Sequence, residues 1–191
     1  MGSDKALLPF GEKTLLQLAL DKAKCVSPAP VIVGARERYA FYGEVIEDRF
    51  PNCGPLGGIH AALCATRTQL NLVMSVDMPL MNAAFLCWLA QTGTLGQEWA
   101  FVPEVRQQLQ PLCAVYRRAA KDVIEQALLM NDFKVSSLFA RIPTRYVRVE
   151  ELSAAGFSPD IFTNVNTPTE YEMANKTNEA AAQQVSEGRC Q

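Results

Sequence analysis

Asp77 is the residue of the chain best placed to bind a metal ion. It follows residues 72–76, five largely apolar positions that predict a buried strand, and it opens the turn Asp77-Met78-Pro79. In an open α/β sheet, ligands bind in the crevice at the carboxyl ends of the strands. A carboxylate there suits Mg²⁺, which takes oxygen ligands and shares them with substrate phosphates. From position alone, an Asp that caps the turn before Pro79 is an equal alternative.

Asp48 repeats this arrangement at the end of a strand expected over residues 45–48. The turn Gly54-Pro55-Leu56-Gly57-Gly58 follows it and leads into a helix. Glycines, which lack a Cβ, let a backbone approach a flat base closely. A tight loop that feeds any helix also favours Gly and Pro, so the turn taken alone favours a structural interpretation.

Further polar residues lie near the two ends of the chain. Asn164 and Asn166 alternate in Asn-Val-Asn, so both point to one side of an extended segment and could contact one ligand. Local Asx turns are the commoner fate of asparagine ahead of a helix. Lys5 follows Asp4, and a single lysine is most often a solvated surface charge. The one histidine, His60, is expected to pack in the helix after the glycine turn.

Together these motifs resemble the molybdenum cofactor guanylyltransferases, within the larger group of sugar-nucleotide-type nucleotidyltransferases. Met1-Gly2-Ser3-Asp4-Lys5 looks like the second half of that family's opening signature, Leu-Ala-Gly-Gly-x-Ser-x-Arg-Met-Gly-x-Asp-Lys. The later motifs follow in the family's order: Gly54-Pro55-Leu56-Gly57-Gly58, Asp77-Met78-Pro79 and Asn164-Val165-Asn166-Thr167-Pro168. The glycine-rich loop, its arginine and the strand before it are not in the sequence, so we expect Met1 to be an internal methionine of a longer frame.

The resemblance implies transfer of GMP from GTP to the molybdopterin cofactor, with release of pyrophosphate and with Mg²⁺ as cofactor. It implies that Lys5 and Asp77 are catalytic, Lys5 at the GTP phosphates and Asp77 on the metal. It places Asp48 and the turn Gly54 to Gly58 on the guanosine side, and Asn164 and Asn166 toward the metal or the pterin. Other molybdenum cofactor enzymes are further implied partners.

Two alternatives stay open at this point. One is a cytidylyltransferase that acts on the same or a related phosphate acceptor. Gly-Pro-Leu-Gly-Gly favours the guanylyl branch, because the cytidylyl branch tends to show a serine-rich turn there. The other takes the chain at face value, as a truncated, non-catalytic nucleotide-binding domain. The loss of a strand from the middle of a sheet weighs against it, because the neighbouring strands are left with unpaired N–H and C=O groups.

The elements that must position these residues alternate between strands and helices. Leu16, Ala19, Leu20 and Ala23 have the spacing of one helix face, and residues 31–34 predict a strand buried on both faces. Further strands are expected over 45–48, 72–76, near 101–102, 112–116 and 146–149, and further helices over 36–41, from 57, 83–91, 117–130, 136–140 and from 168. This predicts one α/β domain over 1–191 with a frayed tail at about 183–191. The expected fold is three-layer and Rossmann-like, of the nucleotide-diphospho-sugar-transferase type. Its sheet should be mostly parallel, with helices on both faces and its first strand missing.

Composition limits the classes of partner that the chain can bind. Eighteen Lys and Arg against 20 Asp and Glu leave a formal charge of −2, so there is no cationic surplus for nucleic acid or an anionic membrane. The six cysteines form no Cys-x-x-Cys pair, and one histidine gives no clustered zinc ligands. With no basic-then-apolar leader and no long apolar span, we expect free thiols and a cytoplasmic protein.

Overall fold

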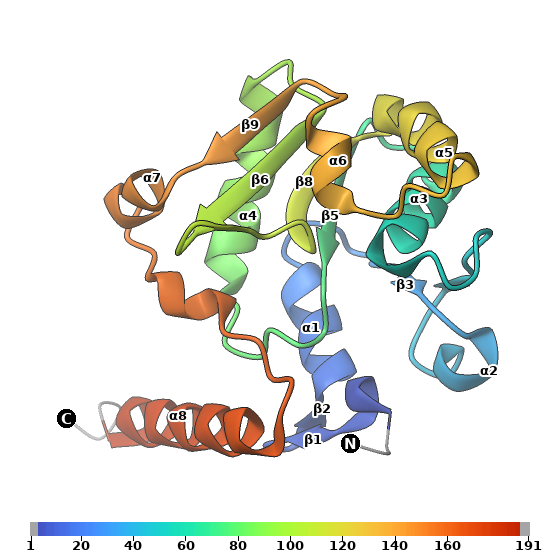
Figure 1. Ribbon diagram of the computed structural model, residues 1–191. Coiled ribbons are helices and arrows are strands. Elements are labelled where there is room, and N and C mark those ends of the chain that lie inside the picture. The colour runs from blue at the N-terminus through green and yellow to red at the C-terminus, as the bar shows by residue number, and fades with distance from the viewer. Residues whose placement is uncertain (1–3, 188–191) are drawn as a thin grey trace.

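The computed structural model describes residues 4–187, with side chains described as far as residue 178 (Figure 1). Three short 3₁₀ turns, η1 (Lys5–Leu7), η2 (Arg118–Ala120) and η3 (Pro159–Phe162), lie between the longer elements. The helices are α1 (Leu15–Ala23), α2 (Arg36–Tyr39), α3 (Gly54–Ala65), α4 (Ala83–Leu95), α5 (Lys121–Leu129), α6 (Val135–Phe139), α7 (Val149–Ala154) and α8 (Pro168–Glu187). The strands are β1 (Pro9–Phe10), β2 (Lys13–Thr14), β3 (Ile32–Val33), β4 (Val45–Ile46), β5 (Leu70–Met74), β6 (Ala100–Val105), β7 (Gln108–Leu109), β8 (Cys113–Arg117) and β9 (Thr144–Val147).

The central sheet is mixed. β8 lies between β5 and β6 and is antiparallel to both, whereas β9 pairs with β6 in parallel. The strands β5, β6 and β9 therefore share one direction, and β8 opposes them. The expected α/β sheet is confirmed, but its ladders at β8 are antiparallel. The cause is a hairpin at Arg106 and Gln107, both with positive φ, which turns the chain back from β6 through β7 before it enters β8.

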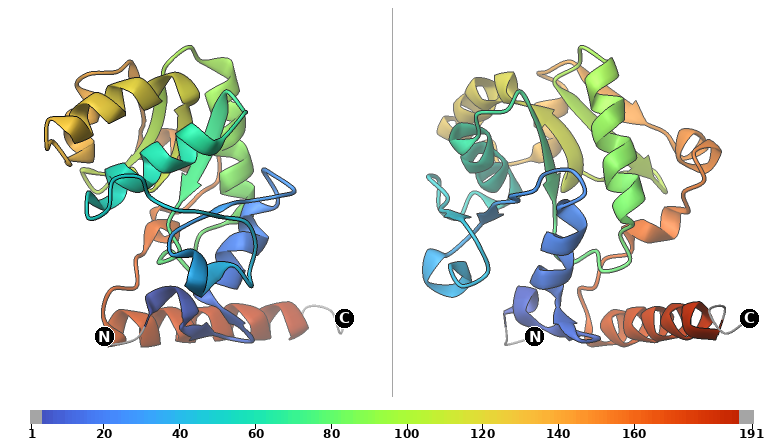
Figure 2. Two further views of the ribbon diagram at one scale, coloured as in Figure 1. Left: turned by 90° about the vertical axis from the view of Figure 1, so that its right-hand side faces the viewer. Right: turned by 180° about the vertical axis from the view of Figure 1, so that it is seen from behind.

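Helices cover both faces of this sheet, as expected. Figure 2 shows α4 on one side and α3 with α5 on the other, and α3 packs on α5 while α1 packs on α4. The two-residue period of β8 serves both layers: Ala114 and Tyr116 join the apolar core under α3 and α5, and Cys113 and Val115 join the core under α4. The strand is therefore buried on both faces.

β3 and β4 form a separate parallel pair, with Ile32 opposite Val45. Among the described residues neither strand pairs with β5. The prediction that residues 31–34 are buried on both faces is wrong: Ile32 is buried, but Val31 and Val33 are 45% and 38% exposed. The reason is that β3 has a strand neighbour on one side, at β4, and not on the side of β5.

The C-terminal helix α8 lies beside the β1–β2 hairpin (Figure 1), where Phe10, Val165 and Ala174 pack in one cluster. α8 begins where a helix was expected, at residue 168, and a capping box fixes its start: the Glu170 N–H donates to Thr167 Oγ1 at 3.2 Å and the Thr167 N–H donates to Glu170 Oε2 at 2.8 Å. The expected tail over 183–191 lies outside the described residues from 188 onward, and α8 includes 183–187. Within residues 4–187 no helix is both long and apolar enough to cross a bilayer.

Candidate active site

Asp77 lies just beyond β5, in the loop that leads to α4. The Val165 N–H donates to the Asp77 carbonyl oxygen at 2.9 Å, which fixes the 164–166 segment against this loop. Two side-chain oxygens of this region, Asp77 Oδ1 and Asn164 Oδ1, are buried and have no hydrogen-bond partner within the described chain. Buried acceptors without donors are costly. A cation that prefers oxygen ligands would satisfy both.

Lys5 comes from the other end of the chain to the same segment. Its Nζ donates to Asn166 Oδ1 at 2.7 Å, across 161 positions of sequence. The structure therefore brings Lys5, Asp77, Asn164 and Asn166 to one place, although sequence spacing alone could not connect them. The resulting group holds a cation, a carboxylate and two amides, which suits a phosphate ligand with its metal.

The position of Lys5 depends on Asp4, which sequence reasoning did not select. Asp4 Oδ1 accepts the Ala6 N–H at 3.1 Å and so caps η1, and Asp4 Oδ2 accepts the Tyr39 hydroxyl at 2.7 Å. Burial, together with the Asp4 carboxylate, raises the pKa of Tyr39 to about 12, so the phenol stays a donor. Asp4 thereby ties the turn that carries Lys5 to α2.

Asp48 and the glycine turn form a second group at the ends of β4 and α3. Asp48 Oδ1 accepts the Phe50 N–H at 2.9 Å. A Cβ built at Gly57 would lie 2.6 Å from Asp48 Oδ2, so the carboxylate occupies the space that a side chain would need. The helix begins at Gly54, whose φ is +63°, three residues before the predicted start. Leu56 is fully buried in the apolar core, backbone included.

Hydrophobic packing connects the two groups. Ala6, Val45 and Val76 belong to one apolar cluster, and they lead to or from Lys5, Asp48 and Asp77 respectively. Within residues 4–187, no hydrogen bond or ion pair joins Asp48 or the glycine turn to the Asp77 group. The structure therefore places the predicted site residues in two groups on a shared apolar support.

Lys22 is a second residue that sequence reasoning missed. Its Nζ donates to the Pro79 carbonyl oxygen, which ties α1 to the Asp77-Met78-Pro79 loop. Burial lowers the pKa of this amine to about 8. The only signal in the sequence is a lysine at the border of the apolar face of α1, and such residues are normally solvated.

His60 is not part of either group. Its side chain is buried, its ring packs edge-to-face on Phe50 with centroids 5.2 Å apart, and its Nε2 lies 3.3 Å from Cys64 Sγ. Burial lowers the pKa of this imidazole, so it is neutral at pH 7. The expectation of a packed histidine is confirmed.

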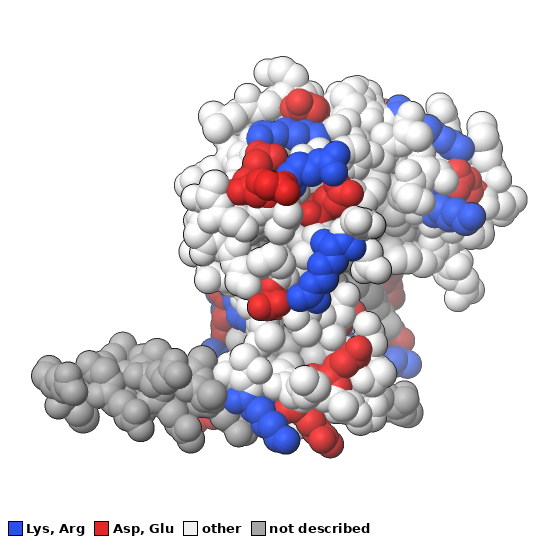
Figure 3. Space-filling model, turned by 60° about the vertical axis from the view of Figure 1, so that its left-hand side comes forward, with Lys and Arg blue, Asp and Glu red and all other residues white. Residues whose placement is uncertain are grey.

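The described residues hold no cluster of three His, Cys, Asp or Glu side chains that could enclose a metal. A cation at Asp77 would therefore have one protein carboxylate, with the Asn164 amide oxygen and substrate phosphates as further ligands. That donor set fits Mg²⁺, which is held in proteins by one or two carboxylates plus phosphate oxygens. Figure 3 shows basic and acidic side chains interspersed over one face of the molecule. An anionic ligand would therefore be bound by individual nearby side chains rather than by a broad basic surface.

In an α/β fold of this kind, with a carboxylate just beyond the carboxyl end of β5, ligands bind at the strand ends, and the chain is a member of the nucleotidyltransferase class. The chain belongs to the family of MobA-like NTP transferase domains, whose family model matches residues 1–146. It is 34% identical over 176 residues to a protein of Pelotomaculum thermopropionicum named "probable molybdenum cofactor guanylyltransferase", covering 91% of this chain and 85% of that one. A protein of the same name from Clostridium perfringens is 30% identical, over 88% of this chain and 86% of the relative.

A solved structure shares the fold as well. Molybdopterin-guanine dinucleotide biosynthesis protein A from Archaeoglobus fulgidus superposes with a TM-score of 0.81 at 28% identity, over 94% of this chain and 92% of the other. The resemblance inferred from four motifs is thereby confirmed along most of the chain, and so is the fold of the nucleotide-diphospho-sugar-transferase type.

Proposed function

We propose that this nucleotidyltransferase transfers GMP from GTP to the terminal phosphate of the molybdopterin cofactor and releases pyrophosphate. The relatives named molybdenum cofactor guanylyltransferases support the substrates. The observation that carries the site is the pair of buried oxygens without donors, Asp77 Oδ1 and Asn164 Oδ1, next to the Lys5–Asn166 hydrogen bond.

In this proposal Asp77 and Asn164 hold Mg²⁺, which neutralises phosphate charge when bound. Lys5 exchanges its bond to Asn166 for a bond to GTP phosphate and so adds a positive charge where negative charge develops. Nucleotidyl transfer needs in-line positioning of the two phosphates rather than a covalent intermediate on the protein. This is consistent with a buried, neutral His60 and with a site built from a carboxylate, amides and a lysine.

Asp48 and the turn from Gly54 to Gly58 form the guanosine side of the proposed site. Guanine carries N–H donors on its edge, and a carboxylate accepts such donors. The absence of a side chain at Gly57 keeps the Asp48 carboxylate close to the first turn of α3. The first turn of a helix presents free N–H groups, which suit an anionic or carbonyl acceptor.

Nucleotide-dependent protection of the folded protein tests the substrate. With Mg²⁺ and GTP at about 100 times Kd, binding stabilises by about 2.7 kcal/mol, which raises Tm by about 5–11 °C for a chain of this size. CTP at the same concentration should leave Tm unchanged, and pyrophosphate should appear only when molybdopterin is added. Equal protection by GTP and CTP would support the cytidylyltransferase alternative. Protection by GTP without any pyrophosphate release in the presence of molybdopterin would support the non-catalytic alternative.

A matched pair of lysine variants tests the phosphate side. Lys5→Met should abolish pyrophosphate release and weaken protection by GTP, because the amine would no longer face the phosphates. Lys13→Met removes an exposed lysine whose partner is Asp21, at 2.6 Å, and should change neither. Equal activity of the two variants would remove Lys5 from the mechanism.

We also propose that the chain acts in the cytoplasm as a single domain and delivers its product to other molybdenum cofactor enzymes. The free thiols of Cys25, Cys53, Cys64, Cys87 and Cys113 support a reducing compartment. Mass spectrometry of protein alkylated before lysis tests this, because disulfides among these residues would contradict it.

A further inference from the structure

Residues 75–82 form the loop that carries Asp77 from β5 to α4. Four apolar side chains anchor this loop in the surrounding core: Val76, Met78, Leu80 and Met81. The Asp77 carboxylate is not anchored in this way, because its Oδ1 is buried without a hydrogen-bond partner in the described chain. The direction in which the carboxylate points therefore depends on how firmly the loop backbone is held around it.

Two hydrogen bonds from distant parts of the chain hold the backbone around Asp77. The Val165 N–H donates to the Asp77 carbonyl oxygen at 2.9 Å. Two residues further on, the Pro79 carbonyl oxygen accepts a hydrogen bond from Lys22 Nζ. Within residues 4–187, Lys22 is the one side chain from outside the loop that hydrogen-bonds to the loop backbone. The polypeptide that carries the carboxylate is therefore fixed on one side by the 164–166 segment and on the other by α1.

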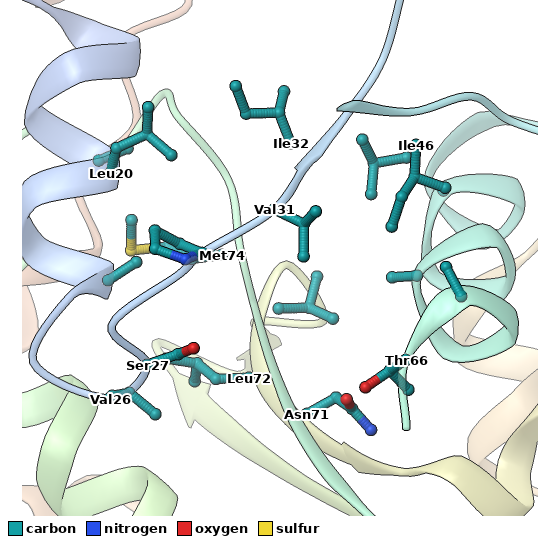
Figure 4. Close-up of a pocket in the computed structure, with 18 of the residues that line it drawn as sticks. Leu20, Val26, Ser27, Val31, Ile32, Ile46, Thr66, Asn71, Leu72 and Met74 are labelled. Carbon is teal, nitrogen blue, oxygen red and sulfur yellow. The ribbon is translucent and has the colours of Figure 1, made fainter. Parts of the chain in front are cut away.

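Lys22 lies near the end of α1, where apolar packing alone does not hold the helix. At the start of α1, Leu16 packs in one cluster with Ala6 of η1 and Val76 of the loop. From residue 17 onward α1 has no fully buried residue, and its side chains border a cavity of about 780 Å³, with Leu20 at the wall (Figure 4). Packing therefore fixes the start of α1, and the Lys22 hydrogen bond ties its end to the loop.

The contact between Lys22 and Pro79 adds little to stability. Burial lowers the pKa of Lys22 to about 8, because a charged amine is less favourable in apolar surroundings than in water. An apolar side chain of similar length would remove this cost but would leave the Pro79 carbonyl oxygen without a donor. These two effects oppose each other, so removal of the ammonium should change the order of the loop more than the stability of the fold.

We propose that Lys22 is a positioning residue of the metal site, which orients the Asp77 carboxylate toward Mg²⁺ by holding the Pro79 carbonyl oxygen. This rests on the proposed function, in which Asp77 is a metal ligand. Groups that hold a metal ligand in place from outside the coordination sphere typically change metal affinity or activity about 10–100-fold when they are removed. Lys22 contacts neither the phosphates nor the metal in this scheme, and it acts only through the loop.

Isothermal titration calorimetry with the full chain tests this proposal. The readout is the factor by which Mg²⁺ tightens GTP binding relative to binding in EDTA. Lys22→Met should lower this factor about tenfold while GTP binding in EDTA and Tm at pH 7 stay close to the parent values. Lys22→Gln, a second variant without the ammonium, should behave alike. Lys24→Met removes an exposed ammonium whose partner is Asp21, at 2.8 Å, and should leave the factor unchanged. A parent-like factor in both Lys22 variants would overturn the proposal.

Hydrogen exchange of the loop amides gives a readout that needs neither metal nor nucleotide. The Met81 N–H donates to the Met78 carbonyl oxygen at 3.1 Å, within the loop. This amide should exchange about tenfold faster in Lys22→Met than in the parent or in Lys24→Met, because the loop loses a charged hydrogen bond. An unchanged exchange rate would overturn the proposal.

Asp77→Ala separates this proposal from the proposed function. If Asp77→Ala loses the effect of Mg²⁺ on GTP binding and the two Lys22 variants keep it, the metal site stands and Lys22 has no part in it. If Asp77→Ala keeps the full effect of Mg²⁺, Asp77 is not a metal ligand, and both proposals are overturned. Loss of the effect in Asp77→Ala together with its reduction in both Lys22 variants is the result expected.

Discussion

Gly57→Ala should destabilise the protein although alanine is the better helix former. The added Cβ would lie 2.6 Å from Asp48 Oδ2 and 3.0 Å from Oδ1, so the carboxylate has to rotate away. Rotation breaks the bond in which Asp48 accepts the Phe50 N–H, at 2.9 Å. A hydrogen bond to a charged group contributes about 1.5–3 kcal/mol, and the gain in helix propensity offsets up to about 1 kcal/mol. The expected net loss is about 0.5–2 kcal/mol, or a fall in Tm of about 1–8 °C.

The neighbouring glycine provides the control. A Cβ at Gly58 meets only Val33 Cγ1, at 3.7 Å, which is an ordinary van der Waals contact. Gly58→Ala should therefore stabilise by up to about 1 kcal/mol. Differential scanning calorimetry measures both variants, and Gly57→Ala in an Asp48→Ala background should lose its penalty. The reasoning is refuted if Gly57→Ala is as stable as Gly58→Ala, or if its cost persists without the Asp48 carboxylate.

For three other perturbations, the structure predicts the direction in which activity, stability or KM changes. Asp77→Ala should abolish pyrophosphate release with little effect on Tm, because Oδ1 has no described hydrogen-bond partner to lose; unchanged release would exclude Asp77 from the mechanism. Burial lowers the pKa of Lys22 from 10.5 to about 8, so the unfolded chain binds the proton more tightly than the folded one. The buried ammonium therefore destabilises the folded protein below pH 8, and this destabilisation is relieved as pH rises toward 10.5. In urea titrations, the stability of Lys22→Met relative to the parent should therefore fall between pH 8 and pH 10, and a rise would contradict this. Tyr39→Phe removes the hydrogen bond to Asp4 and should raise KM for GTP while Tyr42→Phe does not; equal KM values would show that Asp4 does not position Lys5.

The alternation of elements could be predicted because it depends on local patterns. The spacing of Leu16, Ala19, Leu20 and Ala23 gives α1, and the Thr167–Glu170 cap gives the start of α8. Strand direction could not be predicted, because it depends on the two-residue turn at Arg106 and Gln107, where non-glycine residues adopt positive φ. The exposure of Val31 and Val33 was also missed, since an apolar run predicts burial without showing which neighbouring strand provides it.

The site could be predicted only as separate motifs. Asp77 and Asp48 were found because they end apolar strands, a feature visible in one stretch of sequence. Asp4 and Lys22 were missed because their partners, Tyr39 and Pro79, lie 35 and 57 positions away. A polar residue that supports a site through a distant contact has no local signature.

The Lys5–Asn166 contact also determines when the site can form during synthesis. The two residues are 161 positions apart, so at about 5–20 residues per second the ribosome adds Asn166 about 8–30 s after Lys5. The strands β5, β6 and β8 are all made in that interval and can pair before the 164–166 segment exists. A nascent chain stalled before residue 164 therefore holds the central sheet and Asp77 but neither asparagine. Completion of the proposed phosphate side is thus coupled to completion of nearly the whole chain.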